Sequence, residues 1–568
     1  MKKKLLSVLT VALAGILVLG GCKKVENPTT TTPDTDSASA VEGYIKATDS
    51  SKNPIKDRKD TLVIGIDAPE EVFNPLYAES TYDAYVSNTV FEGLITVDDK
   101  GIPKEALAEK YSVSDDGLKY SFKLKDGLKF SDGSPLTTED VAFTYMLGSD
   151  ATYDGPLDFV NSTKIKGAKA YKEGTASTIE GIKIVDDKNI EFTLEDVNAD
   201  AIYDFSTGIL SKAYYGKDYK QGNLDYIKGF HKTPLGAGQY KLVKTVAGQE
   251  VDLVANDNYH LGRPNIANII YKVTSEETRM QMLQTGEIDM DMVTVNQDNV
   301  QSLKDAGFID LHIFPTNGYG YIGFNFKNPK FQDQKVRQAL AYGLNRKEIV
   351  DAVYAGGFAD VINVPQSKVS WAYYKGDNTY EFNKDKAIEL LEEAGWKVGS
   401  DGIREKEGVK LEIKFTASTP NAVNDALIPV AQANYKEIGV KFEAEQMDFN
   451  AVREKVTNGT AEMFFMAWGL TPSPDSTGIF GTNGAQNKTA YSNTKVDELL
   501  AKGLKETNTE KRKEIYKELY KVINEDLPYI FLYQRRDMWA VNSRVKGFDD
   551  QITPYKDFYQ SLYKLTLE

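Results

Sequence analysis

The chain has 568 residues and a formal net charge of −15 at pH 7, with 41% hydrophobic and 27% charged residues. This length exceeds what one simple hydrophobic core organises, so we expect two or three lobes. The negative charge argues against nucleic acids and anionic membrane surfaces as partners, because both repel an acidic protein.

The N-terminus has the pattern of a secretory signal. Met1 is followed by three lysines, and an apolar run then extends from Leu5 to Leu19. This run is shorter than the ~20 residues that a transmembrane helix needs, and small residues follow it, as at a cleavage site. Two glycines then precede Cys22, the only cysteine of the chain.

The order Leu-Gly-Gly-Cys resembles the lipobox of bacterial lipoproteins. The resemblance implies that residues 1–21 are removed and that the sulfur of Cys22 carries a diacylglycerol. A plain secretory signal with an incidental cysteine is the alternative. Residues 22–60 are rich in Ser, Thr, Asp and Lys, and we expect a disordered tether there because so few apolar residues cannot offset the entropy of ordering.

Three strand patterns follow the tether. Residues 61–66 are almost continuously apolar, which indicates a strand buried on both faces. Residues 119–124 alternate polar and apolar side chains, which predicts a strand with one wet face. Residues 181–185 and 189–194 are separated by a polar turn and predict a hairpin.

Helices are predicted between and after these strands. Thr137 and Asp140 resemble a capping box that opens a helix through Met146. Apolar residues then recur at i, i+3, i+4 and i+7 in three further segments, which are 336–344, 387–394 with Gly395 as its end, and 496–504. Apolar residues between 515 and 523 predict one more helix before Pro528. Strands and helices therefore mix along the whole chain, which indicates an α/β protein of several lobes built from discontinuous segments.

Eight segments in this order resemble one family, the extracytoplasmic solute-binding proteins of peptide importers, of the oligopeptide/dipeptide/nickel type. Residues 118–141 are the most diagnostic stretch, and residues 234–240 resemble the family's Gly-x-Gly-Pro-Tyr turn, with Gln239 in place of the proline. The other segments are 258–264, 286–289, 323–325, 336–340, 386–396 and 546–548. Together they cover nearly everything from residue 61 to residue 568.

The resemblance implies a periplasmic-binding-protein-like fold of class II, with three lobes and a hinged ligand cleft. Lobe I would comprise 61–93, 225–315 and 535–568, lobe II would be the insertion 94–224, and lobe III would be 316–534. The chain would cross between lobes I and III near Phe314–Thr316 and near Tyr533–Arg535. Two crossing strands form a hinge, and ligands bind in the cleft beside it.

A receptor for mixed peptides must hold the backbone, which all peptides share, through main-chain hydrogen bonds to strand edges. In the family, an aspartate three residues after a tryptophan takes the α-amino group of the peptide. Trp468 matches this tryptophan, but Thr471 stands at the position of the aspartate, and the next acid is Asp475. Either Asp475 takes the amine from a shifted loop, or the ligand is held without a buried amine.

Further binding candidates follow from the same resemblance. Phe73 and Asn74 follow the first strand, where lobe I of the family meets its ligand. Tyr319 and Tyr321 come just after the first crossing, and Tyr533 lies at the second. Each could equally be a turn or core residue. Arg535 and Arg536 could pair with a ligand carboxylate, although we expect them to be surface charges.

Known catalytic motifs are missing from the sequence. Residues 318–323 match Gly-x-Gly-x-x-Gly but are not followed by the helix pattern that a dinucleotide site needs. No Gly-x-Ser-x-Gly, phosphate-loop or His-Glu-x-x-His motif occurs, and the three histidines are widely spaced. We therefore expect no catalytic residues, no metal site and no cofactor.

The leading hypothesis is a monomeric lipoprotein on the outer face of the cell membrane that captures peptides and delivers them to the transmembrane subunits of an ABC permease. An oligosaccharide or a metal chelate is the alternative ligand, because Thr471 replaces the aspartate and aromatic residues make up 11% of the chain. An envelope hydrolase is the alternative of a different class.

Overall fold

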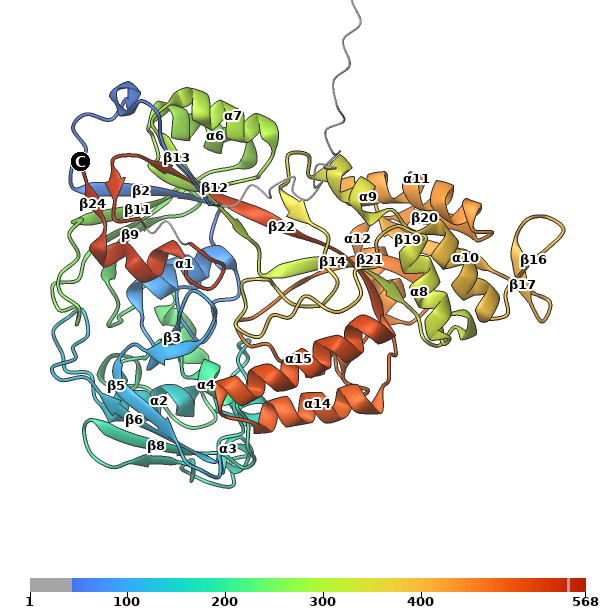
Figure 1. The fold of residues 1–568 in the computed structure, drawn as a ribbon. Coiled ribbons are helices and arrows are strands. Elements are labelled where there is room, and N and C mark those ends of the chain that lie inside the picture. The colour runs from blue at the N-terminus through green and yellow to red at the C-terminus, as the bar shows by residue number, and fades with distance from the viewer. Residues whose placement is uncertain (1–42, 549–551) are drawn as a thin grey trace, which may run out of the picture. The chain divides into compact units, whose positions relative to one another are not determined.

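The computed structural model describes residues 43–548 and 552–568, in which strands and helices alternate along most of the chain (Figure 1). The predicted signal peptide 1–21 and Cys22 lie outside these described residues and stay predictions. The dominant feature of the described part is a mixed sheet of thirteen strands. One long strand, β22 (Tyr529–Asn542), pairs with both halves of this sheet, which we call the first wing and the second wing.

The first wing contains parallel and antiparallel strands. β2 pairs in parallel with β11 and β12, whereas β9, β10 and β13 add antiparallel pairs. Its strands are β1 (Gly43–Ile45), β2 (Thr61–Ile66), β9 (Tyr240–Val246), β10 (Glu250–Ala255), β11 (Asn268–Val273), β12 (Met290–Val293) and β13 (Ile309–Pro315).

The second wing runs in the order β20-β19-β21-β14 and then meets β22. Its strands are β14 (Gly318–Phe324), β19 (Glu412–Ser418), β20 (Lys441–Met447) and β21 (Met463–Gly469). β22 pairs with β14 through its residues 529–533 and with β13 through its residues 536–542. The short strand β15 (Ala359–Asp360) pairs with β22 between these two stretches.

Residues 95–215 contain a second, smaller set of strands. An antiparallel sheet has the order β5-β6-β8-β7, and β3 pairs with β4 beside it. The bounds are β3 (Ile95–Val97), β4 (Pro103–Glu105), β5 (Ala108–Val113), β6 (Lys119–Leu124), β7 (Ile182–Ile184) and β8 (Asn189–Thr193). Two peripheral groups complete the sheets: β16 (Lys397–Val398), β17 (Arg404–Lys406) and β18 (Val409–Lys410), and β23 (Val545–Lys546) with β24 (Thr566–Leu567).

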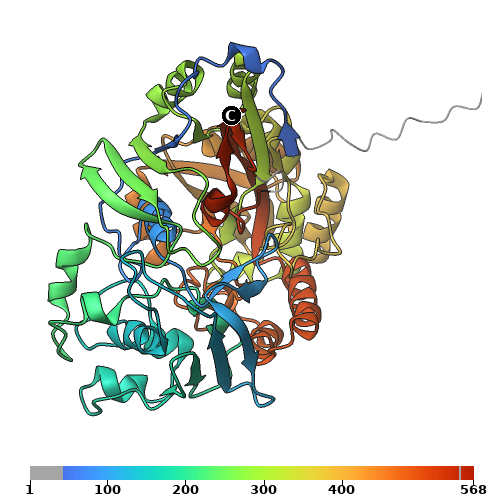
Figure 2. The ribbon, with the colours of Figure 1, turned by 90° about the vertical axis from the view of Figure 1, so that its left-hand side faces the viewer.

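Helices cover the wings and the smaller sheet. α6 and α7 pack on β12 and β13, α11 and α12 pack on β20 and β19, and α14 packs along α15. Figure 2 shows α14 and α15 (orange-red) beside the blue strands of the smaller sheet. The bounds are α1 (Thr81–Val90), α2 (Thr138–Leu147), α3 (Ala168–Lys172), α4 (Ala201–Asp204), α5 (Lys212–Tyr215), α6 (Glu276–Thr285), α7 (Gln297–Ala306), α8 (Gln334–Tyr342), α9 (Arg346–Val353), α10 (Lys384–Glu393), α11 (Ala422–Glu437), α12 (Phe449–Thr457), α13 (Thr477–Phe480), α14 (Thr494–Lys505) and α15 (Thr509–Asp526).

The predicted strands are confirmed. β2 has the predicted bounds, and its side chains enter two different cores: Leu62 and Ile64 lie in one and Val63 in another. A strand that is paired on both edges and covered on both faces has no solvent-exposed face, which explains the continuous apolar run of β2. β7 and β8 form the predicted hairpin, with β7 one residue shorter at each end than expected.

The predicted helices are confirmed with small changes at their ends. Thr137 is the N-cap of α2, and Asp140 completes the capping box. α10 ends at Glu393, and Gly395 follows with φ +86°, a conformation that costs glycine little. α8 ends at Tyr342, so the predicted helix 336–344 is two residues too long at that end.

The Gly-x-Gly-x-x-Gly segment is β14 itself, without a helix after its third glycine. The glycines have a packing role instead. A Cβ on Gly320 would stand 2.4 Å from the Tyr533 ring, and one on Gly323 would stand 2.6 Å from the Phe464 ring. Aromatic side chains thus lie directly on the strand backbone.

The predicted tether 22–60 is too long at its C-terminal end. β1 pairs with β13 through Gly43–Ile45, and the buried Asn53 donates a hydrogen bond of 2.7 Å to Asn542. Arg58 forms an ion pair of 2.9 Å with the buried Asp289. Composition missed this segment because its contacts are polar and use strand edges rather than apolar side chains.

Candidate functional site

The main chain passes between the two wings at two places that lie side by side. β13 ends at Pro315, and β14 begins at Gly318 after the link Thr316–Asn317. β22 crosses beside this link without a break (Figure 1). The Thr316 N–H donates to the carbonyl oxygen of Arg535 at 3.0 Å, so the two crossings are joined by a hydrogen bond.

β21 has an open edge near these crossings. β14 pairs with all seven residues of β21, but β19 pairs only with Met463 and Phe464 on the other edge. Within the described residues, no strand pairs with that edge from Phe465 to Gly469. Ala467 and Gly469 are exposed there. Their backbone groups can therefore accept an added strand from outside.

Trp468 and the two tyrosines of β14 lie on the opposite face of β21 from Ala467. The half-buried Trp468 ring is parallel to Tyr321, with centroids 6.2 Å apart and planes at 2°. Tyr321 stacks in turn on Tyr529 at 4.1 Å. Tyr319 and Tyr321 are buried in the core that α14 and α15 cover. These aromatic residues pack on the face of β21 that is opposite to Ala467. Direct contact between them and a ligand stays a prediction.

Thr471 is exposed in the loop that follows β21. Its carbonyl oxygen accepts a hydrogen bond of 3.1 Å from the Asn317 side chain, which lies in the link between the wings. Asn317 also accepts a hydrogen bond of 2.9 Å from the Tyr555 hydroxyl. The loop after β21 is thus tied to the crossing.

Asp475 lies close to two charged residues, Asp200 before α4 and Arg512 on α15. Its carboxylate accepts hydrogen bonds from the N–H and hydroxyl of Thr477, at 3.2 and 2.6 Å. Burial raises the pKa of Asp475 to about 6, and the nearby Asp200 adds to the rise. Asp200 is ion-paired with Arg512 and accepts a hydrogen bond from Ser473. Sequence reasoning missed Asp200 and Arg512.

Phe73 and Asn74 are buried in the first wing's core region. Phe73 has no exposed surface, and its N–H donates to the His231 carbonyl oxygen at 3.0 Å. The Asn74 side-chain oxygen accepts a hydrogen bond of 3.0 Å from the Leu76 N–H, as in an Asx turn. The side-chain nitrogen of Asn74 is buried and has no hydrogen-bond partner among the described residues. A role of Phe73 and Asn74 in ligand binding stays a prediction.

Tyr533 lies on β22 where the wings meet. It is 8% exposed, its ring covers Gly320, and its centroid is 5.0 Å from that of Tyr354. Beyond it, Arg535 is exposed, as expected, and pairs with Asp537 at 3.2 Å. Arg536 is 2% exposed and pairs with Asp360 at 2.7 Å, so the expectation of a surface charge there was wrong.

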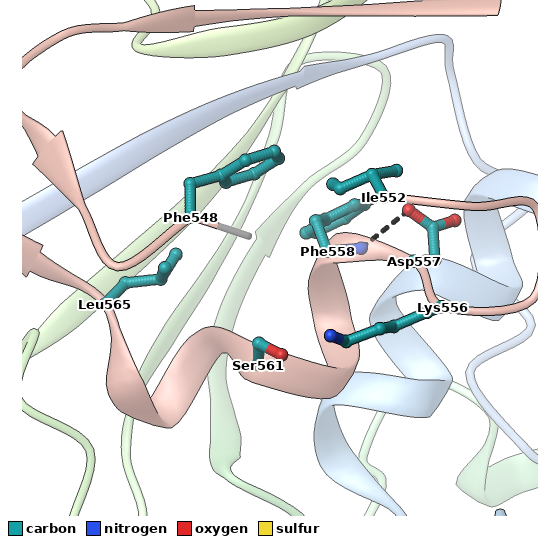
Figure 3. A pocket seen from close by; sticks show the side chains of 7 residues that line it. All are labelled: Phe548, Ile552, Lys556, Asp557, Phe558, Ser561 and Leu565. Atoms are coloured by element: carbon teal, nitrogen blue, oxygen red, sulfur yellow. Dashed lines mark hydrogen bonds between the residues drawn. The ribbon is translucent and has the colours of Figure 1, made fainter. Parts of the chain in front are cut away.

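Two of the cavities in the described part of the chain are small. One holds about 10 Å³ beside the C-terminal segment (Figure 3), close to the space of one water molecule. The other holds about 60 Å³ between β4, β5 and the start of α15, near Arg512 and Trp371. The described residues contain no cluster of His, Cys, Asp or Glu suited to a metal ion. Nor does any described helix have the length and apolarity needed to cross a bilayer.

Residues 103–490 match the family model of the bacterial extracellular solute-binding proteins, family 5, middle domain. The oligopeptide-binding protein AppA of Bacillus subtilis is 31% identical over 514 residues, covering 88% of this chain and 90% of AppA.

Solved structures of two similar proteins have the same fold. The structure of B. subtilis AppA in complex with a nonapeptide matches with a TM-score of 0.66 and 29% identity, covering 90% of this chain and all of that one. NikZ from Campylobacter jejuni in complex with Ni(L-His) matches with a TM-score of 0.68 and 26% identity, covering 89% and 99%. The predicted α/β binding-protein fold is thereby confirmed.

Proposed function

The chain belongs to the bacterial extracellular solute-binding proteins of family 5, which are transport receptors and not enzymes, and from this premise we propose that it captures extracellular peptides. The peptides are delivered, chemically unchanged, to the transmembrane subunits of an ABC permease. Similarity to the oligopeptide-binding AppA over 88% of the chain supports peptides as the ligand class.

The open edge of β21 is the observation that carries this proposal. An extended peptide laid along residues 465–469 gains main-chain hydrogen bonds whatever its side chains are. The exposed Ala467 and Gly469 are small enough to let another backbone approach. A strand edge that is unpaired in the described fold can pair with another chain and cause aggregation unless a partner covers it. In this proposal the transported peptide is that partner.

In this proposal Trp468, Tyr319 and Tyr321 hold the strand in place, and Thr471 and Tyr533 border the peptide. Phe73 and Asn74 shape the facing loop after β2. Asp475 receives the α-ammonium of the peptide. If it does, Asp475→Ala weakens binding of a free-amine peptide by about 2–5 kcal/mol and leaves its N-acetylated form unaffected. A change below threefold for the free peptide would remove Asp475 from the site.

The lobes of the proposal keep the bounds expected from the sequence: lobe I at 61–93, 225–315 and 535–568, lobe II at 94–224 and lobe III at 316–534. Two crossings of the backbone between the wings support a hinge between lobes I and III. Closure of lobe III onto the other lobes would then enclose the peptide against the β21 edge.

Attachment to the outer face of the cell membrane through a diacylglycerol on Cys22 completes the proposal, with the protein acting as a monomer. Two acyl chains hold a protein at a bilayer stably. Labelling of cells with a radioactive fatty acid tests this anchor: the wild-type protein takes up label, and Cys22→Ala does not. Equal labelling of both would contradict lipidation.

The peptide proposal is tested by the ligand backbone itself. A peptide that binds wild-type protein is compared with a copy that is N-methylated at alternate residues. If the β21 edge pairs with the ligand backbone, methylation of the facing amides weakens binding at least tenfold, whereas methylation of the other set has a small effect. Equal affinities for all forms would contradict binding by strand addition.

A metal chelate is the second candidate, because NikZ, which matches with a TM-score of 0.68, holds Ni(L-His). A thermal-shift screen separates the ligand classes, since a ligand at 100 times its Kd adds about 2.7 kcal/mol of stability. Peptides should raise the Tm. A shift with nickel-histidine or with oligosaccharides, and none with peptides, would reverse the ranking.

A further inference from the structure

A cavity lies between the proposed lobes II and III, and we call it the interlobe cavity. It holds about 60 Å³, which is space for several water molecules, because about 10–15 Å³ is enough for one. Residues of β4, β5, β6 and α4 line it from lobe II, and Trp371 and the start of α15 line it from lobe III. Figure 1 shows the start of α15 beside α4. A group that fills this cavity therefore contacts both lobes.

Aromatic rings form much of the cavity wall. Tyr120 and Tyr203 line it from lobe II, and Trp371 lines it from lobe III. The Tyr120 hydroxyl donates to the Asn198 carbonyl oxygen at 2.8 Å, and the Tyr203 hydroxyl donates to the Gly101 carbonyl oxygen at 3.1 Å. The Trp371 indole N–H donates to the Tyr203 hydroxyl at 3.3 Å. Because these polar atoms are already bonded within the protein, the three residues have mainly ring atoms left for contact with an occupant.

One polar group on the cavity wall lacks a partner, the Nη1 atom of Arg512. The Nε atom of this guanidinium donates to the Gly503 carbonyl oxygen at 2.8 Å, and Nη2 binds Asp200 and the Tyr516 hydroxyl. In the part of the chain that the structure describes, nothing accepts a hydrogen bond from Nη1, although the side chain is only 5% exposed. Nη1 is still reachable by solvent, and Arg512 lines the cavity. A hydrogen-bond acceptor held there would satisfy this donor.

The charges around the cavity favour a neutral occupant. The Arg512 guanidinium repels a cation, and Asp200, which is ion-paired with it, repels an anion. Asp475 lies close to both residues, so an anion would meet two carboxyl groups. A charged group would also lose hydration in the cavity without gaining an unshared partner of opposite charge.

We propose that the interlobe cavity binds a phenol group, which is a neutral aromatic ring whose oxygen accepts a hydrogen bond from Arg512 Nη1. The ring packs against the aromatic wall, and a hydrogen bond from a charged donor is stronger than one between neutral groups. Two sources have this chemistry: the tyrosine side chain of a captured peptide and a free phenolic molecule. The peptide source rests on the proposed function, whereas the free molecule does not. Either one bridges lobes II and III and therefore favours the closed state.

Both sources have access to the cavity. Thr507 lines it and is exposed, so a free molecule enters from solvent. Ile102 also lines it and follows Gly101, whose added Cβ would stand 3.3 Å from the Pro472 carbonyl oxygen. Pro472 comes three residues after Gly469, the end of the β21 edge, which is at most about 11 Å of chain. A peptide on that edge therefore needs only a few more residues to place a tyrosine in the cavity.

The first test uses wild-type protein and free probes. p-Cresol has the ring and hydroxyl of a tyrosine side chain, and p-xylene has a methyl group in place of the hydroxyl. Ligand-observed NMR titrations should show at least tenfold tighter binding of p-cresol, because only its oxygen satisfies Nη1. The charged relatives 4-methylbenzoate and 4-methylbenzylammonium should bind more weakly than p-cresol. No binding of p-cresol, or equal affinity for p-cresol and p-xylene, would overturn the proposal and leave water as the occupant.

Val113→Phe shows where p-cresol binds. Val113 lines the cavity, and the larger side chain fills it without removing a side-chain hydrogen bond. The Kd of p-cresol should rise at least tenfold in this variant. Val185→Phe is the matched control, because Val185 is 52% exposed and lies away from the cavity wall, and its Kd should stay within threefold of wild type. Ile102→Phe narrows the cavity from another segment and serves if Val113→Phe does not fold. A Kd that the filling variant leaves unchanged would overturn the proposal.

A competition experiment separates the two sources. Wild-type protein with bound p-cresol is titrated with nonapeptides that carry one tyrosine at different positions, beside copies with alanine in its place. Displacement of p-cresol by a tyrosine peptide alone identifies the peptide side chain, and simultaneous binding identifies a free molecule; both support the site. Displacement by both copies would assign the cavity to the peptide backbone and overturn the proposal. If no peptide binds, the proposed function fails, and the p-cresol titrations still decide this inference.

Discussion

Arg512 and Asp200 form an ion pair although 312 residues separate them in the chain. Arg512 is on α15, and its side chain is 5% exposed. Its guanidinium also donates to the Gly503 carbonyl oxygen at 2.8 Å. Asp200 precedes α4, where the neighbouring Ala199 N–H donates to the Leu504 carbonyl oxygen at 2.7 Å. This contact joins the proposed lobes II and III.

Asp200→Asn should weaken closure of the protein around its ligand. Removal of one partner of a buried ion pair leaves the other charge unpaired, at a cost on the order of 3 kcal/mol. Opening of the lobes relieves this cost, because water then solvates Arg512. We expect a larger radius of gyration at saturating peptide and a Kd at least tenfold higher. The control is Asp351→Asn, which removes an exposed pair with Lys347 and should change neither quantity. An unchanged radius and Kd for Asp200→Asn would refute a role in closure.

Gly320→Ala should destabilise the junction of the wings by about 1–3 kcal/mol, since the added methyl group overlaps the Tyr533 ring. Gly469→Ala is the matched control at the end of β21: nothing lies within 4 Å of its added Cβ, so its stability should stay within about 0.5 kcal/mol of wild type. Urea denaturation measures both. Equal stability of the two variants would show that the close approach of Tyr533 has no energetic role.

Asp291→Asn should change how stability depends on pH. Asp291 is 2% exposed, and burial raises its pKa from 3.8 to about 6 despite a hydrogen bond of 2.8 Å from Thr274. Between these values the folded state keeps a proton that the unfolded state has lost, so this group's contribution to stability falls as the pH rises. The wild type should therefore lose about 2–3 kcal/mol relative to Asp291→Asn between pH 4 and pH 8. Urea denaturation at the two pH values gives this difference. A constant difference between the proteins would contradict a raised pKa.

Local patterns allowed much of the fold to be predicted from the sequence. The bounds of β2, the capping box at Thr137 and the end of α10 near Gly395 follow from short-range preferences that the rest of the structure does not override. The patterns also indicated the α/β class, whereas the binding-protein-like fold and the lobe bounds came from the family resemblance, because periodicity could not give them. The tether prediction failed after residue 42 because β1 and Asn53 are held by partners more than 250 residues away.

The candidate site was less accessible to sequence reasoning. Trp468 and Tyr533 lie near the junction of the wings, but the open edge of β21 depends on where β19 stops pairing. The Asp200–Arg512 pair joins α15 to the residues before α4. Such a pair needs the tertiary structure, because no local motif marks an isolated aspartate as part of a site.

The most direct test of the account is native mass spectrometry of the full protein, purified gently and then incubated with a defined library of peptides. The account predicts one peptide per protein molecule, retained through desalting and released with unchanged mass on denaturation. Retention of a metal chelate or sugar in place of any peptide, or release of shortened peptides, would contradict it.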